Sequence, residues 1–189
     1  LIRAVCDYVL IALKGRGKIK IADASLQSCD FDKILELSGI NELIDFYSTK
    51  SIEIEVIDLR LVKATDNRDS IYGRLIVQKD NVGDPSGYSK IDLSRNSLHA
   101  EKNIDPQRYR VTSYNPSNML LHHNVEKHEY IIANTLLQAD VVINMPKMKT
   151  HRKAGITGAL KNMIGINGHK DCLPHHVKGH KMNGGDEYS

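Results

Sequence analysis

The sequence contains few cysteines and no long hydrophobic run. Its three cysteines, Cys6, Cys29 and Cys172, form no CxxC pair, so they cannot build a disulfide scaffold or a four-cysteine zinc or iron-sulfur site. The longest uncharged apolar run near the start covers residues 8–13, far fewer than the roughly 20 residues that a helix needs to cross a bilayer. We therefore expect no membrane span in this chain and a reducing, cytoplasmic location.

The charge of the chain is modest but unevenly distributed. The 189 residues are 41% hydrophobic and 26% charged, which is the composition of a globular protein that can build its own core. The formal net charge is +3, yet residues 141–189 hold eight lysines and arginines against three acids, together with five of the nine histidines. So small a net charge, with only Tyr188 as an aromatic in the basic part, disfavours nucleic acid as a partner.

Helix and strand signals alternate in the first sixty residues. Apolar residues at helical spacing predict a helix over 2–13, with Cys6 as a small core residue, and alternating apolar residues predict strands over 18–23 and 51–59. Between these strands, Asp30 is placed to cap a second helix. The order strand, helix, strand favours a parallel crossover.

The middle of the chain changes character before the pattern returns. Short strands among Asp, Asn, Gly and Pro predict a small irregular or antiparallel β insert within residues 62–113. A helix is expected over 125–138, preceded by surface or capping histidines at His122 and His123, and a buried strand over 139–144. We predict an α/β fold with a partial, open, mainly parallel sheet and flanking helices.

A dense polar loop follows the predicted strand 139–144. In open parallel sheets, ligands bind beyond the carboxyl ends of strands, where the next helix directs free N–H groups at an anion. Thr150 is a candidate for the N-cap of that helix. Lysines two residues apart on extended chain point the same way. The loop is therefore interpreted as an anion site formed by Lys147, Lys149, Thr150, Lys161 and Asn162, with His151 and His175 moving a proton. The alternative is that the lysines are solvated and that Lys161 complements the end of its helix.

A second polar cluster lies at the end of the chain. Imidazoles and carboxylates at short spacing on a glycine-rich loop can converge on a divalent cation. Adjacent histidines on an extended segment point to opposite sides, which makes it hard for both to bind one metal. The candidate metal ligands are His176, His180, Asp186 and Glu187, with His175 as an alternative member.

The same two clusters carry a family resemblance. The run 139–151, followed by 155–157 and 160–162, resembles the signature of the bacterial and archaeal "domain of unknown function 362" proteins (DUF362), and the continuation to Tyr188 is similar to a branch found among polysaccharide-biosynthesis genes. The resemblance implies one domain, 1–189, that is a fragment truncated at both ends, with 139–188 as its motif region. Some family members carry ferredoxin-like iron-sulfur modules. The resemblance therefore implies an iron-sulfur electron-transfer partner, although this chain has no iron-sulfur motif. The resemblance does not identify a reaction.

Three functions stay open at this point. The first is an enzyme or enzyme-like domain that binds a phosphorylated or carboxylated small molecule. The second is a metal-dependent or redox protein that uses the carboxyl-terminal cluster. The third is a non-catalytic module that binds an acidic glycan or another protein.

The metal hypothesis predicts near-stoichiometric zinc, manganese or iron in protein purified without oxygen. The ion should be lost in His175→Ala or His176→Ala, because each change removes an imidazole ligand. Elemental analysis with an absorption spectrum checks this expectation. A metal-free, colourless protein would remove the hypothesis and leave the lysine and threonine loop as the candidate centre.

Overall fold

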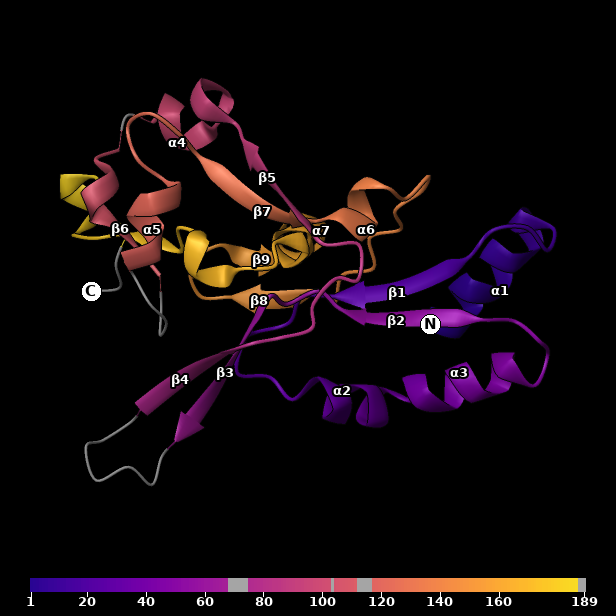
Figure 1. The fold of residues 1–189 in the computed structure, drawn as a ribbon. Helices are drawn as coiled ribbons and strands as arrows, with labels where there is room; N and C mark the ends of the chain where they lie inside the picture. Colours follow the sequence, from indigo (N-terminus) through magenta and orange to yellow (C-terminus); the bar gives the residue numbers. More distant parts are fainter. Residues whose placement is uncertain (68–74, 103, 112–116, 187–189) are drawn as a thin grey trace.

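The computed structural model describes residues 1–67, 75–102, 104–111 and 117–186 (Figure 1). Helices and strands are mixed along the chain, as expected for an α/β protein. The strands of the described residues form five two-stranded sheets. No helix among the described residues is long and apolar enough to span a membrane.

The amino-terminal part contains the parallel crossover that the sequence predicts. It consists of α1 (Ile2–Leu13), β1 (Ile19–Asp23), α2 (Phe31–Ser38), α3 (Ile40–Ser48) and β2 (Ile54–Asp58). Strands β1 and β2 pair in parallel. Figure 1 shows α2 and α3 running below this pair, with α1 beside it. The predicted helix, strands and crossover are therefore confirmed.

Local signals explain where the helices of this part begin and end. The Asp30 side chain accepts a hydrogen bond from the Lys33 N–H at 3.0 Å and caps α2, as predicted. Gly39 has a φ of 70° and divides the expected single helix into α2 and α3, because glycine adopts this left-handed conformation at little cost. Cys6 is buried with Tyr47 in the core between α1, α3 and β2.

The rest of the sheet structure is antiparallel. The pairs are β3 (Val62–Asn67) with β4 (Leu75–Asp80), β5 (Tyr88–Asp92) with β7 (Glu129–Ala133), β6 (Tyr109–Arg110) with β10 (His176–Val177), and β8 (Lys149–His151) with β9 (Gly155–Thr157). Short α-helices connect them: α4 (Leu98–Glu101), α5 (Ser117–His122), α6 (Asn134–Leu137) and α7 (Ala159–Met163). The β3–β4 hairpin matches the predicted antiparallel insert, but the prediction of a mainly parallel sheet is wrong.

Two errors in the interpretation of residues 125–144 account for this difference. The expected helix over 125–138 is instead β7 followed by the four-residue α6. Ile131 and Ala133 are buried while Ile132 between them is only partly buried, so pairing with β5 imposes a period of two on a sequence that also fits a helix. The expected buried strand over 139–144 forms no strand, and its apolar residues are exposed.

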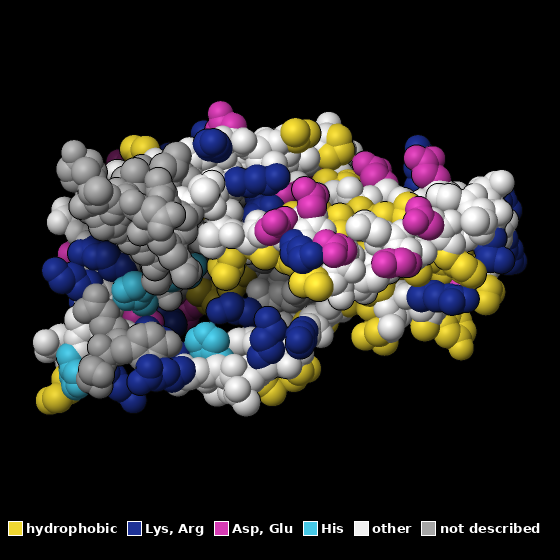
Figure 2. All heavy atoms as spheres, turned by 90° about the horizontal axis from the view of Figure 1, so that it is seen from below, with side chains coloured by type: hydrophobic (Ala, Val, Ile, Leu, Met, Phe, Trp, Pro, Cys, Tyr) yellow, Lys and Arg dark blue, Asp and Glu magenta, His cyan; other side chains and the backbone are white. Residues whose placement is uncertain are grey.

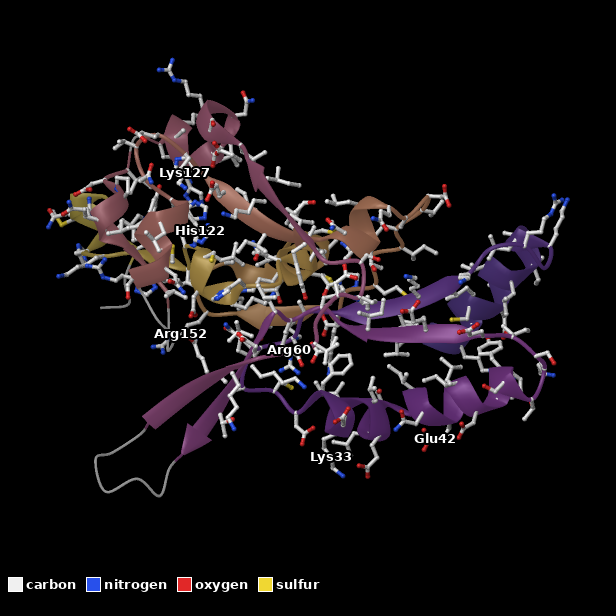
Figure 3. The ribbon with its side chains drawn as sticks, in the orientation of Figure 1. Lys33, Glu42, Arg60, His122, Lys127 and Arg152 are labelled. Carbon is white, nitrogen blue, oxygen red and sulfur yellow. The ribbon has the colours of Figure 1, made fainter. Side chains whose placement is uncertain are left out.

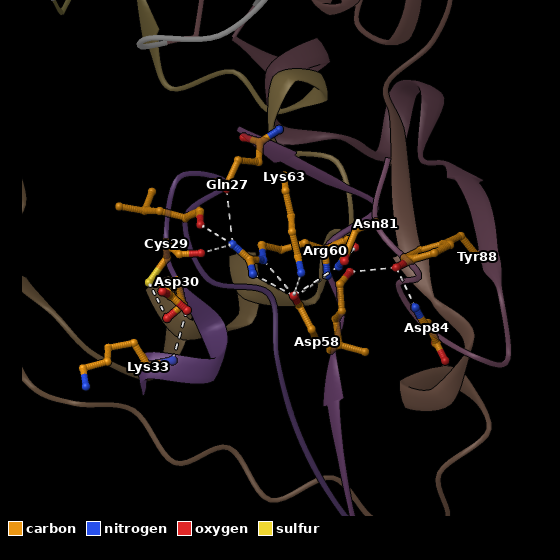
Figure 4. Close-up of polar contacts among 12 residues, drawn as sticks. Gln27, Cys29, Asp30, Lys33, Asp58, Arg60, Lys63, Asn81, Asp84 and Tyr88 are labelled. Atoms are coloured by element: carbon orange, nitrogen blue, oxygen red, sulfur yellow. Dashed lines mark hydrogen bonds and ion pairs between the residues drawn. The ribbon is translucent and has the colours of Figure 1, made fainter. Parts of the chain in front are cut away.

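Arg60 connects three segments at the carboxyl end of β2 (Figure 4). Its guanidinium is fully buried and donates two hydrogen bonds to the Asp58 carboxylate, at 2.8 and 2.7 Å. It also donates to the backbone carbonyls of Leu26, Gln27 and Cys29 in the loop after β1. Burial acts to raise the pKa of Asp58, but the hydrogen bonds and charge of Arg60 outweigh it and hold that pKa below its usual value.

Removal of this guanidinium should destabilise the protein strongly. In Arg60→Met, Asp58 would keep a partly buried charge without its partner, and three carbonyls would lose their donor, so we expect a loss of about 3 to 5 kcal/mol in the free energy of unfolding. Urea denaturation measures it. Arg16→Met removes an exposed arginine and should stay within about 0.5 kcal/mol of the parent protein. Equal effects of the two changes would contradict this account.

Candidate functional site

The carboxyl ends of β1 and β2 lie against the last third of the chain. Asp23 and Asp58 end the two strands side by side in the parallel register. The Gly165 backbone packs so near that an added methyl group would lie 3.5 Å from Asp23 Oδ1, and the Leu61 N–H donates to the Gly168 carbonyl at 2.8 Å. Figure 1 shows β8, β9 and α7 beyond the tips of both strands. This is the edge at which open parallel sheets bind ligands.

Lys170 brings an amine to this edge. Its side chain is 7% exposed, and Nζ donates to the carbonyls of Ile164 and Asn167 at 3.3 and 3.2 Å. Burial lowers the pKa of Lys170 to about 8, against the opposing charge of Asp23. Burial likewise raises the pKa of Asp23, against the charge of Lys170. A buried amine with a lowered pKa beside a carboxylate is typical of functional sites, and also of structural ion pairs.

His175 lies within electrostatic range of Lys170 and of Lys161 on α7. Burial of its ring lowers the pKa of His175, and the charges of the two lysines lower this pKa further. The hydrogen bond with the Leu173 carbonyl acts in the opposite direction and raises it. His175 Nδ1 is 2.8 Å from the Leu173 carbonyl oxygen. His175 therefore interacts electrostatically with Lys161, which the sequence also singles out, and with Lys170, which it does not.

The predicted anion loop folds as the β8–β9 hairpin. Lys149 and Thr150 lie on β8, Lys147 precedes it, and all three are exposed. Thr150 is therefore not a helix N-cap, because the chain turns back through Gly155 and pairs with itself. His151 Nδ1 accepts hydrogen bonds from the two backbone N–H groups of the turn, at 3.2 and 3.1 Å.

The helix expected to begin at Thr150 is only the five-residue α7, which begins at Ala159. So short a helix supplies little dipole, which removes the helix N-terminus from the predicted anion site. Lys161 is exposed on α7. Asn162 Nδ2 donates to Asn144 Oδ1 at 2.7 Å, and Asn144 Nδ2 donates to the Ala159 carbonyl at 2.9 Å. In this structure, the Asn162 side chain thus anchors the preceding segment.

The candidate metal ligands are engaged in local contacts. His180 Nδ1 accepts from the Met182 N–H at 3.2 Å. Asp186 Oδ1 accepts from the Val177 N–H, and its Oδ2 lies 3.4 Å from Lys153 Nζ. His176 lies on β10, and Glu187 falls outside the described residues. Where the structure describes the chain, no three His, Cys, Asp or Glu side chains converge as a metal site, and metal binding stays a prediction. Burial raises the pKa of Cys172 to about 12.

A histidine cluster that the sequence did not predict lies in the core beside α5. His123 is fully buried, rather than at the surface, because the chain returns after α5 and pairs it with His128. Their Nδ1 atoms are 3.2 Å apart. The His99 ring lies 5.8 Å from the ring of His123 and 5.7 Å from that of His128, centroid to centroid. His123 and His128 are five residues apart on either side of a turn that the Asn124 side chain stabilises. This spacing is the sequence signal that could have predicted the pair.

The neighbours of this histidine cluster are also polar. His122 and Lys127, which are labelled in Figure 3, both contact Glu129 Oε2, at 3.1 and 3.0 Å. Burial lowers the pKa of His123 to about 4 and also lowers the pKa of His128. A hydrogen bond between two Nδ1 atoms needs a proton on one of them and a lone pair on the other. The cluster is thus a structural polar core in which the buried rings stay neutral.

Comparison with known protein families finds a match that covers part of the chain. The model of the family described as "Domain of unknown function (DUF362)" matches residues 99–185. The match covers Lys161, Lys170 and His175, and it supports assignment of this part of the chain to the DUF362 family. No curated protein and no solved structure matches the chain.

The stability of the protein should fall as the pH falls from about 6.5 to about 4. The pKa of His123 is near 6.5 when the chain is unfolded and about 4 when it is folded, so between these values the unfolded state binds more protons. His123→Gln should reduce the slope of unfolding free energy against pH by up to about 1.4 kcal/mol per pH unit. Urea denaturation from pH 4 to 8 measures the slope.

Met119→Leu is the matched control for this measurement. Met119 is a buried neighbour on α5 that does not titrate, so this change should lower stability without altering the slope. An unchanged slope in His123→Gln would contradict the assignment.

Proposed function

We propose that the chain binds a small phosphorylated or carboxylated molecule at the carboxyl end of the β1–β2 pair. The observation that carries the proposal is the buried Lys170 amine, whose Nζ donates to the carbonyls of Ile164 and Asn167, on either side of the Gly165 backbone that packs against Asp23. An anion placed among these groups would favour the charged form of Lys170 and replace the solvation that burial removes.

The balance of charge at this edge supports an anionic ligand. The two carboxylates have cationic neighbours, because Asp58 pairs with Arg60 and Asp23 interacts with Lys170. The exposed lysines of the hairpin region and α7 form no ion pair with any residue that the structure describes. These lysines are Lys147, Lys149 and Lys161. On the face seen in Figure 2, Lys and Arg side chains border a hollow in the surface. Positive charge therefore exceeds what the neighbouring acids neutralise.

The two histidines of the proposed site are suited to different roles. His175 Nδ1 faces a carbonyl oxygen, which favours a proton on Nδ1 and leaves Nε2 free to accept a proton as a general base. His151 Nδ1 accepts hydrogen bonds from two backbone N–H groups, which places the proton of the neutral ring on Nε2, where it can donate a hydrogen bond to the anion.

Lys147 and Lys149, which lie just before and at the start of the β8–β9 hairpin and are called the hairpin lysines, should be needed for anion binding but not for folding. Lys147→Met with Lys149→Met should abolish binding of the anion, while the free energy of unfolding changes by no more than about 1 kcal/mol, because both side chains are exposed. Isothermal titration with inorganic phosphate, a sugar phosphate and a dicarboxylate measures binding.

The double variant Lys14→Met with Lys18→Met removes the same charge from exposed positions near α1 and is the matched control. It should bind as the parent protein does. If the hairpin variant also binds as the parent does, the hairpin lysines are not part of the site. If the parent protein binds none of the three probes, the proposed function is wrong.

A further inference from the structure

Four buried side-chain atoms near the carboxyl edge of the β1–β2 pair have no hydrogen-bond partner among the residues that the structure describes. They are the hydroxyl oxygen of Ser25, both polar atoms of the Gln27 amide, and Nδ2 of Asn167. Gln27 is 0% exposed and Asn167 is 2% exposed. An unpaired buried amide lowers stability, and folded proteins leave few of them. These atoms therefore need a partner that the fold does not supply.

The loop after β1 fixes the backbone of Gln27 and leaves its side chain free. The Gln27 carbonyl accepts hydrogen bonds from Arg60 Nη1 at 3.3 Å and from the Ala64 N–H at 2.8 Å. The side chain extends away from the Arg60 guanidinium (Figure 4), and it can turn without breaking a hydrogen bond. Leu26 and Ser28, on either side of Gln27, are exposed. The loop thus lies at the surface, where a ligand can reach it.

The segment that carries Asn167 packs against the same loop and holds the amine of the proposed anion site. An added methyl group at Gly165 would lie 3.9 Å from the carbonyl oxygen of Ala24, the residue before Ser25. The Asn167 carbonyl accepts a hydrogen bond from Lys170 Nζ at 3.2 Å. The unpaired Nδ2 of Asn167 therefore belongs to the residue that holds the buried amine.

The unpaired groups are uncharged and include both donors and acceptors. The Gln27 amide has one acceptor oxygen and two N–H donors, Asn167 Nδ2 is a donor, and the Ser25 hydroxyl both donates and accepts. A fully ionised phosphate or carboxylate only accepts hydrogen bonds, so it would leave the Gln27 oxygen unpaired. Hydroxyl groups both donate and accept. A ligand with several hydroxyl groups can therefore pair with all of these atoms.

We propose that the anion bound at this edge carries several hydroxyl groups, as a sugar phosphate or a sugar acid does, and that Gln27, Ser25 and Asn167 bind those hydroxyls. This inference rests on the proposed function, in which the lysines bind the anionic group. Gln27 then determines specificity, because a site built to hydrogen-bond a hydroxyl discriminates against an analogue that leaves the site unpaired.

Isothermal titration with a hexose phosphate and with cyclohexyl phosphate tests this inference on the full chain. The two compounds share the anionic group and the ring size, but only the hexose phosphate has ring hydroxyls. The parent protein should bind the hexose phosphate about 100-fold more tightly. Gln27→Met should reduce this preference by about 10-fold or more and change the affinity for cyclohexyl phosphate by no more than about twofold, because it removes only the amide.

The stability of Gln27→Met without ligand separates a binding role from a structural one. Urea denaturation should show no loss of stability, because the change removes an unpaired polar group from the interior. Gln107→Met is the matched control. Gln107 is exposed, and its change should alter neither the preference nor the stability. Ser25→Ala is a second variant that removes one hydroxyl, and it should reduce the preference in the same direction.

The outcomes distinguish a failure of this inference from a failure of the proposed function. If the parent protein binds both compounds with equal affinity, the anion site stands and the inference is overturned. If Gln27→Met is less stable and keeps the preference of the parent, the amide is structural and the inference is overturned. The same holds if Ser25→Ala keeps the full preference when Gln27→Met does not fold. If the parent binds neither compound, the proposed function fails for phosphates, and this inference fails with it.

Discussion

The ion pair between Arg60 and Asp58 is the interaction on which the arrangement of the candidate site depends. A buried guanidinium needs several acceptors at fixed positions. Asp58 supplies two of them and the loop after β1 supplies three more. Asn81 at the end of β4 donates to the same carboxylate at 3.1 Å. One buried cation thereby links the end of β2, the loop after β1 and the β3–β4 hairpin.

The carboxyl-terminal third of the chain is fastened to this same edge by polar groups. The Gly168 carbonyl accepts from Leu61, and the Gly168 N–H donates to the Ile131 carbonyl at 2.9 Å, so residues near 168 connect β2 to β7. A methyl group on Gly168 would lie 2.3 Å from a ring carbon of Tyr88, so only glycine allows this approach. This packing buries Lys170. Burial of the amine lowers the pKa of Lys170 more than the nearby charge of Arg60 does.

The structure contains two kinds of buried polar group. The histidine cluster around His123 is enclosed in the core, and its rings are kept neutral by desolvation. Lys170 lies near the edge of the β1–β2 pair and interacts electrostatically with His175. Charge that is already balanced by neighbours stabilises the fold, whereas we propose that the unbalanced charge of the exposed lysines binds an anionic ligand.

The sequence by itself determined the elements that local interactions specify. Helical apolar spacing over Ile2–Leu13, the Asp30 cap and the alternation in β1 and β2 depend on residues a few positions apart, and the motif region could be recognised from its own residues. Only the tertiary structure decided whether 125–138 became a helix or a strand, because the partner β5 lies about forty residues away. The same holds for Lys170 and His123, whose burial depends on distant segments. Desolvation is a property of packing, and no local pattern encodes it.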